Sequence, residues 1–236
     1  MKAPIIEIFS SIQGEGLLIG ERQIFVRFAG CNLNCSYCDT ENSKSVESGK
    51  LMTVEEVINE INRLKTPDVY SVSFTGGEPL LHAEFINEVI KHIELKSLLE
   101  TNGTLPNELN KIENLTWASV DIKLPEHFDN IWSEKILENE ILFLKLLIQD
   151  NINLYCKMVV LPSTSINTVE RVIKQISKEI PIKDIPIKDI PLVLQPVSPL
   201  NLWKDNNINL FKFSECIGKY MTVYTIPQIH KILNIE

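Results

Sequence analysis

Three cysteines, Cys31, Cys35 and Cys38, lie within the segment "RFAGCNLNCSYCDT". Three thiolates can hold zinc, but a structural zinc site needs a fourth ligand, and the nearest histidine, His82, lies far along the chain. A 4Fe-4S cluster also usually takes four cysteines, although one iron can be left without a protein ligand so that a small molecule binds it. The spacing therefore indicates a metal site, with zinc and an open iron-sulfur cluster as the alternatives.

Glycines and charged residues follow three of the apolar runs in the sequence. In "TGGEP" (75–79), Gly76 and Gly77 let the backbone approach a ligand closely, and Glu78 can accept a hydrogen bond from an ammonium group. "ETNGT" (100–104) and "SVDIK" (119–123) end two further runs. Because βα architectures build their sites at the carboxyl ends of strands, we expect these residues to share one pocket. The alternative is simple turn chemistry.

The elements that must position these residues follow a βα pattern. Apolar, β-rich runs alternate with helical periods, which predicts an α/β fold with a largely parallel sheet in one domain, residues 1–236. The predicted strands are 23–29, 70–75, 97–101, 115–122, 153–161, 192–197 and 222–226. Cys156 and Cys216 lie in apolar segments and are expected to be buried small side chains.

Helices are predicted between these strands. Thr53 and Glu56 have the spacing of a capping box, and Asn167 and Glu170 repeat that spacing before a second helix. Segment 134–149 is apolar almost all round, which predicts either deep burial or contact with another subunit. The tandem repeat "IPIKDIPIKDIP" (180–191) contains prolines that exclude a regular helix or a central strand, so we expect a surface linker, with a lid as the alternative.

The composition narrows the class of protein. The 236 residues carry a net charge of −8, which argues against a broad cationic surface for nucleic acid and favours a small-molecule substrate. No apolar stretch is long enough for a membrane span, and the N-terminal segment lacks the plan of a signal peptide. Three of the five cysteines are clustered, as in metal sites of reducing compartments. We therefore expect a cytoplasmic protein.

The C-x3-C-x2-C pattern, with the aromatic Tyr37 before the last cysteine, resembles the signature of the radical S-adenosylmethionine (SAM) superfamily. The resemblance implies a 4Fe-4S cluster on Cys31, Cys35 and Cys38, with SAM as the ligand of the fourth iron. It favours the cluster over zinc. It also implies that SAM is bound by a further set of residues, namely Tyr37, Cys38, Asp39, Gly76, Gly77, Glu78, Pro79, Glu100, Asp121, Ile122 and Lys123.

Four further segments carry a narrower resemblance: "SIQGEG" (11–16), the arginine of "FVRFAG", "CDT" ending at Thr40, and "PQIHK" (227–231). Together they resemble the 7-carboxy-7-deazaguanine synthase family. That resemblance implies a partial (β/α) barrel that works as a homodimer and converts 6-carboxy-5,6,7,8-tetrahydropterin to 7-carboxy-7-deazaguanine with loss of ammonia. It implies an electron donor such as a flavodoxin or ferredoxin.

The same resemblance assigns residues to the substrate and to a magnesium ion. Mg²⁺ is expected to bridge the Thr40 hydroxyl and the substrate carboxylate. A C-terminal tail, residues 227–236, is expected to close the substrate site. The residues implied for the pterin are Ile12, Gln13, Gly14, Arg27, Thr75, Gln228 and His230.

Two other functions are compatible with parts of the sequence. A glycyl-radical-activating enzyme shares C-x3-C-x2-C and "GGEP" but acts on a protein partner, and "SIQGEG", Thr40 and "PQIHK" favour the pterin substrate. A non-catalytic zinc or iron-sulfur module would not need the ordered motifs at the strand ends. Absorbance separates these modules, because a zinc protein is colourless and a 4Fe-4S protein is brown.

Overall fold

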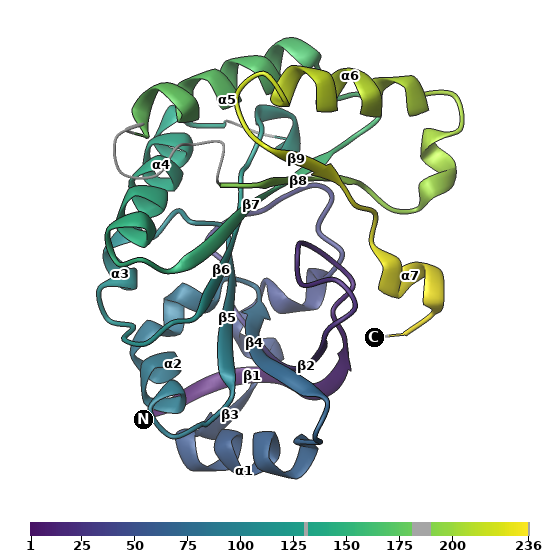
Figure 1. Cartoon of the computed structure of the whole chain (residues 1–236). Helices are drawn as coiled ribbons and strands as arrows, with labels where there is room; N and C mark the ends of the chain where they lie inside the picture. The colour runs from purple at the N-terminus through teal and green to yellow at the C-terminus, as the bar shows by residue number, and fades with distance from the viewer. Residues whose placement is uncertain (130–131, 181–189, 236) are drawn as a thin grey trace.

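A computed structural model describes residues 1–129, 132–180 and 190–235 (Figure 1). Within these ranges nine strands form one sheet. They are β1 (Lys2–Ile12), β2 (Arg22–Phe28), β3 (Lys50–Thr53), β4 (Val69–Gly76), β5 (Lys96–Thr101), β6 (Trp117–Asp121), β7 (Asn153–Val160), β8 (Leu192–Pro196) and β9 (Val223–Thr225). The α-helices are α1 (Val54–Leu64), α2 (Ala83–Ile90), α3 (Pro106–Leu109), α4 (Glu134–Gln149), α5 (Ile166–Glu179), α6 (Asn207–Ile217) and α7 (Ile229–Leu233). The 3-10 helices are η1 (Glu41–Ser43), η2 (Val46–Ser48), η3 (Pro79–His82), η4 (Pro125–His127) and η6 (Leu200–Trp203).

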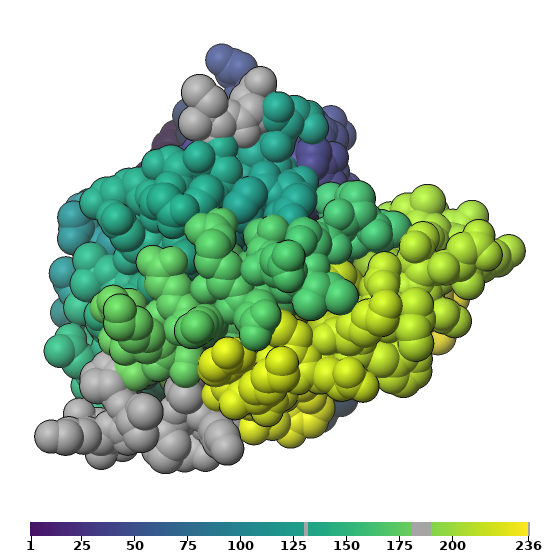
Figure 2. Space-filling model, turned by 90° about the horizontal axis from the view of Figure 1, so that it is seen from above, coloured from purple at the N-terminus to yellow at the C-terminus, as the bar shows by residue number. Residues whose placement is uncertain are grey.

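The sheet has the order β3-β1-β2-β4-β5-β6-β7-β8-β9. Strands β2 and β4 to β9 run parallel to one another, while β1 is antiparallel to both β2 and β3. The sheet is curved, with α2 to α5 along one side and α7 on the other (Figure 1). Seen from above, α4, α5 and α6 cover one continuous face (Figure 2). This architecture confirms the predicted partial (β/α) barrel.

All seven predicted strands are present. Six of them are largely buried, and buried parallel strands read as nearly continuous apolar runs, whereas β9 is short and mostly exposed. Strands β1 and β3 were not predicted. Strand β1 contains Pro4, and its pairing with β2 shifts register between Ile5 and Glu7, so its sequence lacks a regular alternation. Strand β3 has only four residues, two of them exposed.

The two predicted helix caps have different outcomes. Thr53 and Glu56 form the expected capping box at the start of α1. The prediction for Asn167 and Glu170 is wrong, since α5 begins at Ile166 and Ser165 is its N-cap, with no side-chain cap hydrogen bond. Asn167 therefore lies inside the first turn of α5. The capping pattern was present in the sequence, but the apolar contacts of Ile166 and Val169 with the core start the helix earlier.

Helix α4 buries much of its apolar sequence within this chain, and contact with another subunit stays a prediction. Phe143, Leu144 and Leu147 are fully buried, and the helix packs on β6 and between α3 and α5, while Leu142 on the outer side is 44% exposed. Cys156 and Cys216 are buried, as predicted. Residues 181–189 of the proline-containing repeat lie outside the described residues. Among the described residues, none of the helices is both long enough and apolar enough to cross a membrane.

Candidate active site

A cavity of about 370 Å³ opens at the carboxyl ends of the parallel strands. Its walls come from the β1–β2 connection, the cysteine segment, the ends of β4 to β7 and the C-terminal tail. The predicted site residues that line it are Ile12, Gln13, Gly14, Arg27, Cys31, Cys35, Tyr37, Cys38, Asp39, Thr40, Thr75, Gly76, Gly77, Glu100, Asp121, Lys123 and His230. Glu78, Pro79, Ile122 and Gln228 are not among its lining residues.

The cysteine segment leaves β2 and is held by backbone hydrogen bonds. Gly30 N–H donates to the Ser43 carbonyl at 2.8 Å, and Ser36 N–H donates to the His127 carbonyl at 2.8 Å. The three thiols are free and line the same cavity. Burial raises the pKa of the Cys31 and Cys35 thiols. A bound cation would reverse this preference, because a coordinating thiol is deprotonated.

The two glycines of "TGGEP" bring the end of β4 against the start of the cysteine segment. Gly76 has φ +128°, and a Cβ atom there would overlap the Phe28 backbone. Gly77 N–H donates to the Phe28 carbonyl at 3.0 Å, and Glu78 N–H donates to the Gly30 carbonyl at 2.8 Å. Only glycine permits this approach, which makes the backbone of β4 part of the cavity wall.

The carboxylate of Glu78 lies behind that wall. It accepts hydrogen bonds from Thr101 Oγ1 at 2.6 Å, Asn102 N–H at 2.8 Å and Leu80 N–H at 3.0 Å. Burial raises the pKa of Glu78 to about 6. In this structure Glu78 joins the ends of β4 and β5, so its contact with SAM stays a prediction.

Two lysines balance the carboxylates at the base of the cavity. Lys157 Nζ lies 2.6 Å from Glu15 and 3.2 Å from Asp121, and Lys123 Nζ lies 3.0 Å from Asp121. Lys123 also donates to the Tyr37 hydroxyl at 3.0 Å. Burial alone would raise the pKa of Asp121, but the ammonium groups of Lys123 and Lys157 outweigh it and lower that pKa.

The Glu100 carboxylate holds three neighbouring side chains in place. It accepts hydrogen bonds from Gln13 Nε2 at 2.7 Å, Ser73 Oγ at 2.8 Å and Thr75 Oγ1 at 3.2 Å. Gln13 Nε2 also donates to Gln23 Oε1 at 3.0 Å. Glu100 was predicted to bind the cofactor, and here it fixes two residues predicted to bind the substrate.

Arg27 faces the cavity from β2. Its Nε–H donates to Glu7 at 2.7 Å across the antiparallel pair of β1 and β2, and its guanidinium lies 5.5 Å from the centroid of the Phe9 ring. The Arg27 side chain is 20% exposed. A planar guanidinium in this position suits a carboxylate.

The C-terminal tail lies over the "SIQGEG" loop. Gln228 Nε2 donates to Glu15 at 2.6 Å and to Asp39 at 3.0 Å, and Lys231 Nζ lies 2.7 Å from Asp39. His230 packs against Gly14, where a Cβ atom would overlap its ring. The tail therefore connects the loop after β1 with the residue after the last cysteine of the motif.

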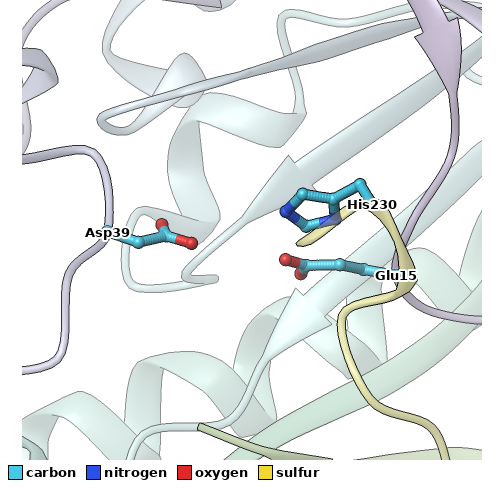
Figure 3. A group of neighbouring side chains, drawn as sticks. All are labelled: Glu15, Asp39 and His230. Carbon is cyan, nitrogen blue, oxygen red and sulfur yellow. The ribbon is translucent and has the colours of Figure 1, made fainter. Parts of the chain in front are cut away.

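Glu15, Asp39 and His230 point toward one another (Figure 3). One ligand atom from each lies within 4.8 Å of the other two, so the group could bind a cation. However, the two carboxylates already interact with Lys157, Lys231 and Gln228. A cation here would compete with two ammonium groups.

The sequence was compared with known families and relatives. Residues 25–176 match the Radical SAM superfamily. A 7-carboxy-7-deazaguanine synthase from Methanothermobacter thermautotrophicus is 47% identical over 100% of this chain and 99% of its own length. The chain belongs to the 7-carboxy-7-deazaguanine synthase family. A second relative of that name, from Methanocaldococcus jannaschii, is 40% identical over 98% of this chain and 99% of its own.

The fold is also similar to a solved structure. The crystal structure of QueE from Escherichia coli covers 94% of this chain and 93% of its own, with a TM-score of 0.61 and 21% identity. That likeness supports the partial barrel. The names of the curated relatives do not favour a glycyl-radical-activating enzyme.

The donor set fits the cofactors of a radical SAM enzyme. Three thiols on one wall of a cavity supply the protein ligands of a 4Fe-4S cluster, and membership of the superfamily implies this cluster together with SAM. The cavity beside the thiols is lined by backbone of Gly76 and Gly77 and by Glu100 and Asp121, which offer acceptors for an ammonium group.

Several residues in and around the site had no role predicted from the sequence. Lys157 interrupts the apolar run of β7, and a lysine in a buried strand was the available signal. Glu15 lies within the "SIQGEG" motif, but no role was assigned to it. His127 is fully buried, accepts from Leu124 N–H at Nδ1 and packs edge-on against Tyr37, and nothing in the sequence indicated it.

Proposed function

We propose that this member of the family converts 6-carboxy-5,6,7,8-tetrahydropterin to 7-carboxy-7-deazaguanine with loss of ammonia. The observation that carries the proposal is one cavity lined by three cysteine thiols, the "SIQGEG" loop and the guanidinium of Arg27. A bound cluster with SAM would supply a 5′-deoxyadenosyl radical that removes hydrogen from the carboxylate-bearing carbon. The protein must then bind the substrate carboxylate, form hydrogen bonds with the edge of the pterin ring and exclude water from the cavity.

Arg27 is proposed to bind the substrate carboxylate. Glu7 takes its Nε–H group, so the two terminal nitrogens of the guanidinium can form a paired contact with a carboxylate. The backbone of Ile12, Gln13 and Gly14 is proposed to bind the pterin edge. Gln13 is preorganised for this role, because its side chain is already held by Glu100 and Gln23.

The tail is proposed to cover the bound substrate. Gln228 and Lys231 hold it against Glu15 and Asp39, and His230 lines the cavity. A closed cover would keep water from the radical.

Magnesium is proposed to bind at Thr40. The Thr40 hydroxyl lies 3.8 Å from Cys38 Sγ and lines the cavity, so it would offer a neutral oxygen ligand to a cation beside the cysteine segment. We expect Thr40→Ala to raise the magnesium requirement for turnover and to leave iron content unchanged, while Thr40→Ser retains the wild-type requirement. An unchanged magnesium dependence in Thr40→Ala would remove this role.

Two partners are also proposed from the family. The enzyme is expected to be a homodimer, which sedimentation equilibrium tests directly, and a monomer at micromolar concentration would contradict it. Its reductant is expected to be a flavodoxin or ferredoxin. Reduction of the cluster by dithionite but by neither protein would contradict that choice.

The substrate assignment is tested by equilibrium binding of the stable analogue 6-carboxypterin to cluster-loaded protein with SAM. Loss of one charge-assisted contact costs about 1.5–3 kcal/mol, so we expect Arg27→Ala to weaken binding by about 10- to 150-fold. Pterin without the carboxylate is the matched control, and its affinity should be nearly equal for both proteins. Equal binding of 6-carboxypterin by both proteins would contradict the role of Arg27.

A further inference from the structure

Lys44, which lies outside the cysteine motif, contacts the cysteine segment at three places. Its ammonium donates to the Asn34 side chain at 2.7 Å and to the Cys35 carbonyl at 3.3 Å. Its own carbonyl accepts from Cys31 N–H at 3.2 Å. Lys44 thus connects the positions of two cluster cysteines, and it lines the cavity beside them.

The charge of Lys44 is only partly neutralised. Glu41 lies 2.8 Å from its ammonium, but the Glu41 side chain is 68% exposed whereas that of Lys44 is 21% exposed. Water therefore screens the carboxylate more effectively than the ammonium. Lys123, which also lines the cavity beside the cysteine thiols, is paired with Asp121.

We propose that the Lys44 ammonium raises the reduction potential of the 4Fe-4S cluster held by Cys31, Cys35 and Cys38. Reduction adds one negative charge to the cluster, and a fixed positive charge nearby stabilises the reduced form. Cluster potentials respond to net charge and hydrogen bonding around them. Lys44 is accordingly a positioning residue that also favours electron entry. The inference rests on the cluster of the proposed function.

The test is a redox titration of reconstituted protein without pterin, followed by the electron paramagnetic resonance signal of the reduced cluster. For Lys44→Met we expect about a tenfold loss in the equilibrium constant for reduction, which is a shift of about 59 mV to more negative potential for one electron. Lys44→Arg keeps the charge and should stay close to wild type. Glu41→Gln should shift the potential in the positive direction. Lys50→Met, which removes an exposed lysine on β3, is the matched control and should cause no shift.

Equal potentials for Lys44→Met and wild type would overturn the proposal. So would an equal shift in Lys44→Met and Lys44→Arg, because geometry and not charge would then be responsible. If Lys44→Met fails to hold a cluster, Lys44→Gln decides, because glutamine keeps a hydrogen-bond donor without the charge, and an unchanged potential there refutes a role for the Lys44 charge. The titration contains no pterin, so a wrong substrate leaves its result intact. A wild-type protein that takes up no cluster would refute both proposals.

Discussion

The Lys157 ammonium lies between the carboxylates of Glu15 and Asp121, and its side chain is 10% exposed. Lys157 thus compensates the Glu15 carboxylate and shares the compensation of Asp121 with Lys123. Removing one partner of a buried pair is more costly than the net value of the pair, because the remaining charge is left without compensation.

We expect Lys157→Met to lower the free energy of unfolding by about 3–5 kcal/mol, measured by urea denaturation of the metal-free protein. The double variant Lys157→Met with Glu15→Gln should recover part of the loss, because one anion is removed with the cation. Lys174→Met, on the exposed side of α5, is the control and should change stability by less than about 0.5 kcal/mol. Loss of less than about 1 kcal/mol in Lys157→Met would contradict this charge balance.

The carboxyl group of Glu140 allows a second test of how a single buried charge affects stability. It is fully buried on α4, its Oε1 accepts from Lys123 N–H at 3.0 Å, and Oε2 has no partner among the described residues. Burial raises the pKa of Glu140 well above its ordinary value of 4.5. The folded protein therefore binds this proton more tightly than the unfolded chain, and the stability it contributes is lost as pH rises through the folded-state pKa.

Glu140→Gln keeps the acceptor and removes the titration. We expect the wild type to lose stability relative to this variant as pH rises above 4.5, by up to about 1.4 kcal/mol per pH unit, in denaturation curves measured across pH. Glu140→Leu, which also lacks the acceptor, should be less stable than Glu140→Gln at every pH. A constant difference between wild type and Glu140→Gln would show that Glu140 does not titrate in this way.

Single residues differ in how far the sequence predicted them. The three cysteines of the motif and Arg27 were predicted because metal ligands and family motifs have fixed spacing in the sequence, and all four line the cavity. Lys157 and His127 were missed, because their roles depend on contacts with segments far away in the chain. The side-chain contacts of Glu78 were likewise set by β5, which the "TGGEP" motif does not contain.

Two helices show what a cap contributes at the scale of an element. In α1 the Thr53 side chain accepts from Glu56 N–H, and the Glu56 carboxylate accepts from Thr53 N–H. In α5 the N-cap residue Ser165 makes no side-chain cap hydrogen bond. Both N-cap residues carry a hydroxyl group, but only that of Thr53 forms a cap hydrogen bond.

Thr53→Ala should cost about 1 kcal/mol, a fall in Tm of about 2–4 °C for a chain of this size. Ser165→Ala should cost clearly less, because no cap hydrogen bond is lost. Differential scanning calorimetry of both variants makes the comparison. A larger loss in Ser165→Ala than in Thr53→Ala would contradict the assigned caps.

Strands that are mostly buried were predictable from the sequence. Strands β2 and β4 to β8 stood out as apolar runs, and the short, mostly exposed β9 was predicted from its β-rich sequence. Strands β1 and β3 were not predicted, since they lie at the antiparallel edge and have exposed or irregular positions. The start of α5 was missed because the capping pattern gives only a local preference, and core contacts of the first turn decided the start.

The C-terminal tail contacts the N-terminal hairpin beside the cavity. Ile229 N–H donates to the Gly14 carbonyl at 3.0 Å, and Gln228 contacts both Glu15 and Asp39. The tail thus contacts the N-terminal hairpin and the cysteine segment beside the cavity. The sequence indicated a tail at the site only through the family resemblance, since the contacts join residues from the two ends of the chain.

A chain ending at Ile226 should retain cluster uptake and SAM binding but lose about 100-fold in pterin turnover, because the substrate is no longer held in place. Iron content and circular dichroism report on folding, and released 5′-deoxyadenosine reports on the radical step. Lys231→Met, which removes one tail contact, should have a smaller effect. Wild-type turnover by the shortened chain would exclude a role for the tail.

The central claim is tested most directly by turnover. The protein is purified without oxygen, reconstituted with iron and sulfide, and incubated with SAM, a reductant, Mg²⁺ and 6-carboxy-5,6,7,8-tetrahydropterin, with the product followed by mass. We predict 7-carboxy-7-deazaguanine without stoichiometric loss of SAM, and no product from Cys35→Ala. Cleavage of SAM to 5′-deoxyadenosine with no pterin-derived product would contradict the proposed reaction while leaving the radical chemistry intact.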